Sequence, residues 1–287
     1  MIASGNGTSG NGASSSATET LDPPMPQRLP TSLVEAGMVV GLLVAVLIAW
    51  EAAVYVFKPA PIILPAPSVI WQEFLLSPGY FLQMSAFTLY TTLAGFGLAV
   101  VLGLALAVGI VHSKFIERTV YTLLVALNSV PKVALAPLFV IWMGTGVEPK
   151  IAIALMLALF SVVIDAVLGL RSVDPDMVNL ARASRASSFD ILRKIRFPNA
   201  LPSIFAGLKV AISFALVGAI VGEFVAGSEG LGFAILTAQG QFDTPRVFVC
   251  LMLLGLLGTA LFFVVEACER LLLPWHVSQR GGGGSGH

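Results

Sequence analysis

The sequence has few charged residues and almost no cysteine. Only 11% of its 287 residues are Asp, Glu, Lys or Arg, whereas 56% are hydrophobic. A soluble globular domain carries about a quarter charged residues, so this chain cannot cover a surface that faces water. A lipid bilayer is the solvent that suits it. The 16 basic and 16 acidic residues cancel, which gives nucleic-acid binding no electrostatic support.

Several chemical devices are also missing from the sequence. Cys250 and Cys268 lie about five helical turns apart in one apolar segment, which disfavours a disulfide between them, and no metal site is expected. The chain lacks a Gly-x-x-x-x-Gly-Lys-Ser/Thr phosphate-binding loop, so we expect no ATP hydrolysis and no cofactor bound by this chain. His112, His276 and His287 lie at the edges of apolar segments or in the tail. This placement disfavours the alternative of an intramembrane enzyme.

What the sequence does contain is six long apolar segments. Each has the roughly 20 residues that a helix needs to cross a hydrocarbon core of about 30 Å. They are continuously apolar, whereas the strands of a membrane barrel alternate over about 10 residues. The sequence therefore predicts an all-α polytopic membrane protein with about six transmembrane helices. The predicted spans are 33–57, 84–111, 119–143, 150–170, 201–226 and 247–273.

The remaining segments define the predicted domain organisation. Residues 1–30 are rich in Gly, Ser, Thr and Pro and are expected to be a disordered tail. Residues 31–275 form one membrane domain, and 276–287 are a tail with the remnant of an engineered linker and tag. The proline-rich segment 58–83 is predicted to hold a short amphipathic helix from Ser68 to Leu76, capped by Ser68; a plain connecting loop is the alternative.

Small residues recur every four positions in the second apolar segment, at Gly95, Ala99, Gly103 and Ala107. A row of this kind lets two helix backbones approach closely. We expect this face to pack against another helix, the alternative being small residues that face lipid.

The distribution of positive charge predicts the orientation. With a cytoplasmic N-terminus, the inner segments hold eleven Lys and Arg residues and the outer segments hold three. Because cytoplasmic loops carry the excess of positive charge, both termini are predicted to be cytoplasmic.

The inner segment at about 172–200 has the sequence pattern of two short helices. Asp174 followed by Pro175 is typical of a helix start, and Ser187 with Asp190 three residues later resembles a capping box. We therefore predict helix, turn, helix and then membrane. The alternative is a solvated basic loop.

This segment resembles the signature loop of ABC-importer permeases of bacteria. The family pattern is Glu-Ala-Ala, three residues, Gly, nine residues and Ile-x-Leu-Pro, and it fits here without a gap. Ala181, Ile195 and Pro198 match the pattern. Asn179 stands for the Glu, Leu180 for the first Ala, Arg185 for the Gly and Phe197 for the Leu.

Other segments are similar to permeases for nitrate, taurine, aliphatic sulfonates and related small organic solutes, and the resemblance covers about residues 65–273. The similar segments are 131–138, 142–144, 206–209, 218–224 and 230–232. The resemblance implies the transmembrane-domain architecture of type I ABC importers and a location in the bacterial cytoplasmic (inner) membrane. It also implies three kinds of partner: ATP-binding cassette ATPase subunits that use ATP and Mg, an extracytoplasmic solute-binding protein, and a second permease copy in a homodimer.

The resemblance further implies that the inner loop docks on the ATPase. Leu180 and Phe189 are expected to fill a groove of that partner, and the arginines to contact its rim. The predicted coupling residues are Asn179, Leu180, Ala181, Arg182, Arg185, Ala186, Ser187, Phe189, Asp190 and Pro198.

Polar residues within the apolar segments are candidates for the solute path, because charge is costly in a bilayer and marks function. Lys132 follows Pro131 and is expected to attract an anionic solute or to pair with Glu223. Asn128 and Ser213 are further candidates, with hydrogen bonds between helices as the alternative. Lys132 favours a sulfonate, carboxylate or similar anion. A neutral heterocycle or vitamin precursor is the alternative solute, and a stand-alone carrier or channel is the alternative outside this class.

Overall fold

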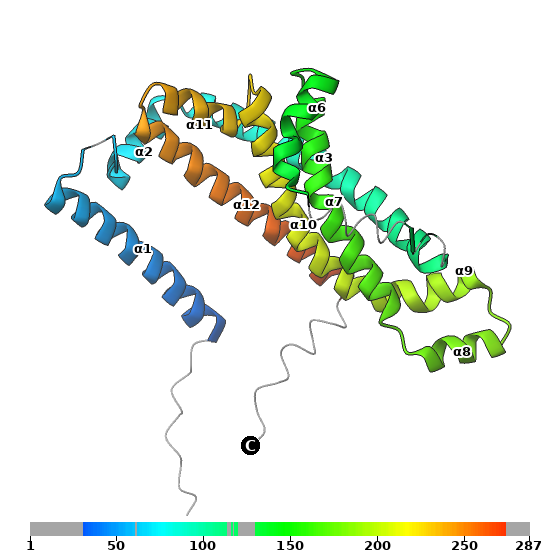
Figure 1. The fold of residues 1–287 in the computed structure, drawn as a ribbon. Helices are drawn as coiled ribbons and strands as arrows, with labels where there is room; N and C mark the ends of the chain where they lie inside the picture. The colour runs from blue at the N-terminus through cyan, green and yellow to red at the C-terminus, as the bar shows by residue number, and fades with distance from the viewer. Residues whose placement is uncertain (1–30, 61, 114–115, 117, 120–129, 274–287) are drawn as a thin grey trace, which may run out of the picture. The chain divides into compact units, whose positions relative to one another are not determined.

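The structure is a computed structural model that describes residues 31–60, 62–113, 116, 118–119 and 130–273. Every regular element in these residues is helical (Figure 1). The elements are α1 (Thr31–Phe57), α2 (Pro67–Leu76), α3 (Pro78–His112), the 3₁₀ turn η2 (Lys132–Leu135), α6 (Ala136–Met143), α7 (Glu148–Arg171), α8 (Pro175–Ala183), α9 (Ser188–Ile191), the π turn η3 (Leu192–Arg196), α10 (Phe197–Ala226), α11 (Leu231–Gly240) and α12 (Thr244–Leu272).

The chain divides into two units between Ala49 and Trp50, within α1. The described part of the first unit is the helical segment 31–49. The second unit begins at Trp50 and contains all the other elements. Within it, α8 and α9 lie at one end of the helix bundle, and α2 and α11 lie at the other (Figure 1).

Five helices in the described part of the chain are long and apolar enough to cross a membrane. They correspond to the predicted spans 33–57, 84–111, 150–170, 201–226 and 247–273. In the predicted third span, 119–143, residues 120–129 lie outside the described residues. Its described end forms η2 and α6. Residues 1–30 and 276–287, the predicted tails, also lie outside the described residues.

The centre of the second unit is built from α3, α7 and α10, which meet through small residues. The predicted row on α3 is buried, and a Cβ placed on Gly95 would lie 2.5 Å from the Cβ of Ala154 on α7. On the other side of α7, a Cβ on Gly218 of α10 would lie 2.5 Å from the Cα of Ala154. Backbones this close give many dispersion contacts, which drive helix association in lipid. The packing prediction for the α3 row is confirmed.

Polar contacts attach α12 to its neighbours. Lys209 on α10 forms an ion pair with Glu269 on α12, and both side chains are largely buried. At the opposite end, Arg246 donates two hydrogen bonds to Oε1 of Glu73 on α2, at 3.1 and 2.9 Å. These pairs satisfy charges that would otherwise be costly in an apolar environment.

Two local predictions need correction. Helix α2 exists, but Ser68 does not cap it: the helix begins at Pro67 after Ala66, and the hydroxyl and amide of Ser68 both donate to Glu51. The proline supplies the start, since its missing N–H is not needed there. Helix α11 was not predicted at all, because its ten residues are too few to stand out as a span.

Candidate functional site

The two start signals of the inner loop form as predicted. At the start of α8, Oδ1 of Asp174 accepts a hydrogen bond from the amide of Asp176 at 2.8 Å, and Pro175 is the first helical residue. At the start of α9, Oγ of Ser187 accepts from the amide of Asp190 at 3.1 Å and donates to its carboxylate. Each cap satisfies an amide that has no partner within its helix.

The turn between α8 and α9 is a Schellman motif centred on Arg185. The amide of Ala186 donates to the carbonyl of Ala181 at 3.0 Å, and the amide of Arg185 donates to that of Arg182 at 2.9 Å. Arg185 has φ of +61°, the left-handed conformation that such a turn requires. Glycine usually fills this position because it has no Cβ. The structure thus gives the physical reason for the Gly in the family pattern, and Arg185 adopts the same backbone conformation.

The loop also has a small core of its own. Val173, Val178 and Ile191 are buried together, and Ala181 and Ala186 pack against them. Burying one such aliphatic side chain is worth about 1.5–3 kcal/mol. The capped helices, the turn and this core make residues 173–191 a defined helical hairpin, which we call the hairpin.

Large apolar side chains on the hairpin point away from this core. Leu180 is 70% exposed and Phe189 is 67% exposed. Met177 is 55% exposed and lies one helical turn before Leu180. Sequence reasoning missed Met177, although its three-residue spacing from Leu180 places both on one face of α8. Exposed apolar side chains clustered on a polar segment are typical of a protein-binding surface.

Three further residues of the predicted coupling set lie in the hairpin or shortly after it. Asp190 forms an ion pair with Lys194 at 2.9 Å, one turn further along the chain. Asn179 is exposed and lines a hollow beside Arg182. Pro198 is the second residue of α10 and follows the π turn η3.

A second candidate site is a cavity within the membrane-spanning part, of about 580 Å³, between η2, α7 and α10. Lys132 lines it, with its Nζ 4.2 Å from the centre of the Phe160 ring. Asp165, Phe160 and Phe214 also line it, and all three were missed as site residues. The sequence pointed to the lysine because of its charge, whereas the rings lie in ordinary apolar segments and become a site only through packing.

Glu223 belongs to a different cluster near the other end of α10. Its carboxylate accepts from the hydroxyl of Thr88 at 2.8 Å and from the amide of Gly232 at 2.8 Å. The same hydroxyl accepts from the amide of Leu231 at 2.9 Å. Glu223 is fully buried and thereby joins α3, α10 and the start of α11. It does not line the cavity that contains Lys132.

Ser213, another polar candidate, does not line that cavity. The hydroxyl of Ser213 donates to the carbonyl of Lys209 in its own helix at 3.4 Å. Asn128 lies outside the described residues. Of the described members of the predicted solute-path set, Lys132 lines the cavity between η2, α7 and α10, whereas Ser213 and Glu223 do not.

The family of binding-protein-dependent transport system inner membrane components matches residues 99–273, which include the hairpin and the membrane cavity. The chain belongs to this family. It is an ABC-importer permease, and the all-α polytopic architecture predicted from the sequence is confirmed. Permeases of this family work in the membrane, generally with an ATPase and a binding protein as partners.

Individual permeases are similar over most of this chain. The riboflavin transport system permease protein RibX of Chloroflexus aurantiacus is 36% identical, over 82% of this chain and 89% of its own. The formylaminopyrimidine transport permease protein ThiX of Halalkalibacterium halodurans is 33% identical, over 81% and 93%. A putative aliphatic sulfonates transport permease protein, SsuC of Bacillus subtilis, is 32% identical, over 85% and 90%.

Among solved structures, the MetNI methionine ABC transporter in an inward-facing conformation has the same permease fold. It superposes with a TM-score of 0.59 at 20% identity and covers 67% of this chain and 95% of that chain. This likeness concerns the fold of the membrane helices.

Proposed function

We propose that the hairpin couples this permease to a separate ATPase and that the importer carries a small organic solute. The observation that supports the coupling role is the exposure of Leu180 and Phe189 on a segment whose own core is already complete. Their burial therefore requires another molecule. Apolar side chains that project from a rigid helix can fill a groove on a protein partner.

The path from the hairpin into the membrane is a continuous helix. Residues Ser188–Ala226 pass through α9, η3 and α10 without interruption. Phe189 lies near the start of this continuous helix. Phe214 lies further along the same helix and lines the membrane cavity. A movement of the ATPase that displaces Phe189 therefore displaces the wall of the cavity as well.

The assembled importer, as we propose it, follows from the family. Two copies of this chain form the path as a homodimer, with 31–275 as the transmembrane domain. ATP and Mg bind to the ATPase, and the solute arrives on an extracytoplasmic binding protein. Both termini and the hairpin face the cytoplasm of the bacterial inner membrane, in keeping with the positive charge of the inner segments.

The coupling role is tested by copurification of the full chain with its candidate ATPase subunit. Phe189→Ala and Leu180→Ala each remove one of the exposed apolar side chains. We expect each variant to reduce the amount of ATPase that copurifies. Leu168→Ala is the matched control, because Leu168 is a similarly exposed leucine on α7, at 61%. Arg185→Gly removes a charge from the turn while keeping its backbone conformation.

Full recovery of the ATPase with both Phe189→Ala and Arg185→Gly would refute the assignment of the hairpin as the coupling element. Recovery that falls equally in the Leu168→Ala control indicates a general loss of folding. Melting temperatures of the purified variants separate the two cases.

For the solute, we propose a neutral or dipolar aromatic heterocycle. Lys132 and Asp165 both line the cavity, so these two fixed charges balance, and the exposed ring of Phe214 offers a face for stacking. The permeases named for riboflavin and formylaminopyrimidine transport support this choice. An anionic sulfonate is the second candidate, supported by Lys132 and by the permease named for aliphatic sulfonates.

Uptake into proteoliposomes that contain the complete importer distinguishes the candidates. Riboflavin, a pyrimidine and an aliphatic sulfonate serve as probes. We expect a heterocycle to be carried and Phe214→Ala to reduce its uptake. Carriage of the sulfonate alone, with loss of uptake in Lys132→Ala, would establish the anionic candidate. Unchanged sulfonate uptake in Lys132→Ala would remove Lys132 from the solute path.

A further inference from the structure

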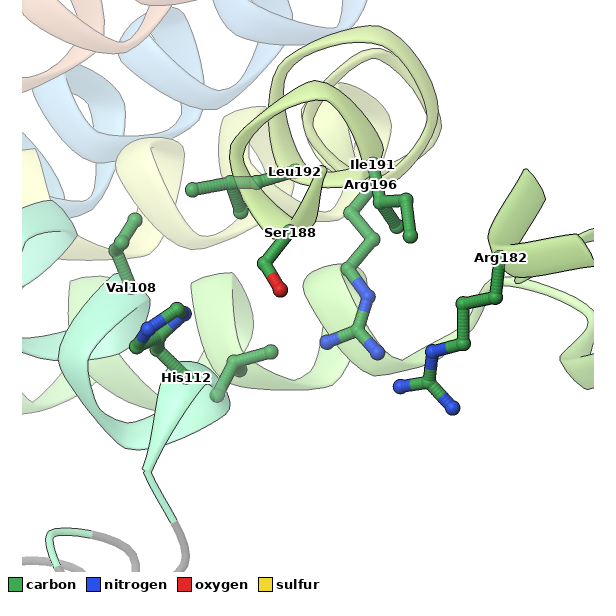
Figure 2. Close-up of a pocket in the computed structure, with 8 residues that line it drawn as sticks. Val108, His112, Arg182, Ser188, Ile191, Leu192 and Arg196 are labelled. Carbon is green, nitrogen blue, oxygen red and sulfur yellow. The ribbon is translucent and has the colours of Figure 1, made fainter. Parts of the chain in front are cut away.

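Another cavity, separate from the one that contains Lys132, lies where the end of α3 meets the hairpin. It measures about 120 Å³ and is lined by His112 of α3, Arg182 of α8, Ser188 of α9 and Arg196 of η3. Figure 2 shows the guanidinium groups of Arg182 and Arg196 projecting toward the same side, with Ser188 and His112 facing the space beside them. Four elements therefore bring hydrogen-bond donors to one place.

Of the described residues that line this cavity, none is acidic. Among the residues that the structure describes, no carboxylate forms an ion pair with Arg182 or Arg196. The nearby acids have other partners, since Asp190 binds Lys194 and Ser187, and Asp174 caps α8. Two like charges that share a cavity repel each other, so an anion that binds between them relieves this repulsion.

We propose that this cavity binds a phosphate group, either on the headgroup of an anionic lipid or as free phosphate. Guanidinium groups bind phosphate oxygens through paired, charge-assisted hydrogen bonds. A cavity needs about 10–15 Å³ of this kind of volume to hold one water molecule, so this cavity has room for the oxygens of a phosphate group. The hydroxyl of Ser188 supplies a further donor.

The position of the cavity favours the lipid as the source. His112 is the last residue of α3, which crosses the membrane, so the cavity lies at the level where lipid headgroups meet that helix. Basic pockets beside transmembrane helices bind anionic headgroups in the cytoplasmic leaflet. Because Arg182 belongs to α8, an occupied site ties the hairpin to the end of α3 and makes its position depend on lipid.

The test compares lipid binding by the full chain and by matched variants. The protein is purified from nanodiscs that contain phosphatidylcholine, with or without phosphatidylglycerol, and bound lipid is counted by native mass spectrometry. In parallel, binding of inorganic phosphate is measured by calorimetry. Arg196→Gln removes a lining guanidinium, and His112→Gln changes the lining from another helix. Arg193→Gln is the control, because Arg193 lies in the same turn but outside the cavity.

We expect Arg196→Gln to weaken phosphatidylglycerol binding at least tenfold, since it removes a charge-assisted hydrogen bond, and Arg193→Gln to leave this binding unchanged. The same variant pattern with inorganic phosphate, and no preference for phosphatidylglycerol, would identify free phosphate as the ligand. Equal losses in Arg193→Gln and Arg196→Gln, or no binding of either probe, would overturn the site. Arg196→Lys, which keeps the charge, checks that losses do not come from misfolding.

Discussion

At the scale of single residues, Arg185 has an unusual conformation with a clear cost. Its φ of +61° places it in the left-handed region, at the position where a Schellman turn normally has glycine. For a residue with a Cβ this conformation costs roughly 1–2 kcal/mol. The hydrogen bonds of Ala186 and the core around Val178 hold Arg185 there.

Replacing Arg185 by glycine should therefore stabilise the turn. We expect Arg185→Gly to stabilise the hairpin by about 1 kcal/mol, so that hydrogen exchange at the amide of Ala186 slows about fivefold. Arg185→Val should speed this exchange, because a β-branched residue is poorly tolerated at positive φ. Ser184→Gly is the control, since Ser184 has a negative φ of −79° and should gain nothing. Faster exchange in Arg185→Gly than in the parent would contradict the strain argument.

Thr88 illustrates a second effect at this scale, a hydroxyl that serves two buried partners. It donates to Glu223 and accepts from the amide of Leu231. Thr88→Val keeps the shape but removes the acceptor of the Leu231 amide and one of the donors to Glu223, and we expect a loss of about 1–3 kcal/mol in the free energy of unfolding. A fall in melting temperature of the solubilised protein measures it. Thr88→Ser, which keeps the hydroxyl, should be much milder; a parent-like Thr88→Val would show that the hydroxyl is dispensable.

At the scale of elements, the contact between α3 and α7 depends on where small residues lie. Gly95 faces α7 so closely that an added Cβ would lie 2.5 Å from the Cβ of Ala154. Gly97, two residues later, has nothing within 4 Å of an added Cβ. The two glycines therefore have opposite roles in the same helix.

This difference predicts opposite effects of one substitution. Gly95→Ala should lower the free energy of unfolding by about 1–3 kcal/mol, because overpacking forces the helices apart. Gly97→Ala should raise it by up to about 1 kcal/mol, because alanine favours the helix and meets no neighbour. Denaturation of both variants in detergent gives the comparison. A Gly95→Ala protein as stable as Gly97→Ala would contradict the packing of α3 on α7.

Among the elements, some features could be predicted from the sequence and others could not. The starts of α8 and α9 were predictable, because Asp174 and Ser187 bind amides only two or three residues away. The row of small residues that begins at Gly95 was also predictable, because residues four positions apart lie on the same face of a helix. The cavity was not, since Phe160 and Asp165 meet Lys132 only after η2 packs against α7. Local sequence patterns predict helices and their ends. Contacts between residues that lie far apart in the sequence become visible only in the packed structure.

At the scale of the whole molecule, the second unit has two distinct ends. The hairpin lies at one end, and α2 with the preceding loop lies at the other (Figure 1). The hydroxyl of Thr244 donates to the carbonyl of Ile62 at 2.7 Å and fixes that loop to the start of α12. The excess of basic residues near the hairpin predicts that this end is cytoplasmic.

Cysteine labelling tests this orientation. In a Cys268→Ser background, Leu180→Cys and Ile63→Cys place thiols at opposite ends, and both parent side chains are exposed. We expect a membrane-impermeant maleimide to label Ile63→Cys in spheroplasts and Leu180→Cys only in inverted vesicles. Cys250 is buried and should stay unlabelled in the background variant. The reverse pattern would place the hairpin outside the cell and refute its coupling role.

The close approach of α7 and α10 has a consequence for transport. Because Gly218 lies directly against the backbone of Ala154, sliding α7 past α10 would break this close contact between the two helices. We therefore expect them to move as one rigid body during the transport cycle. In the homodimer that we propose, opening and closing of the solute path would then take place at contacts other than the one between α7 and α10.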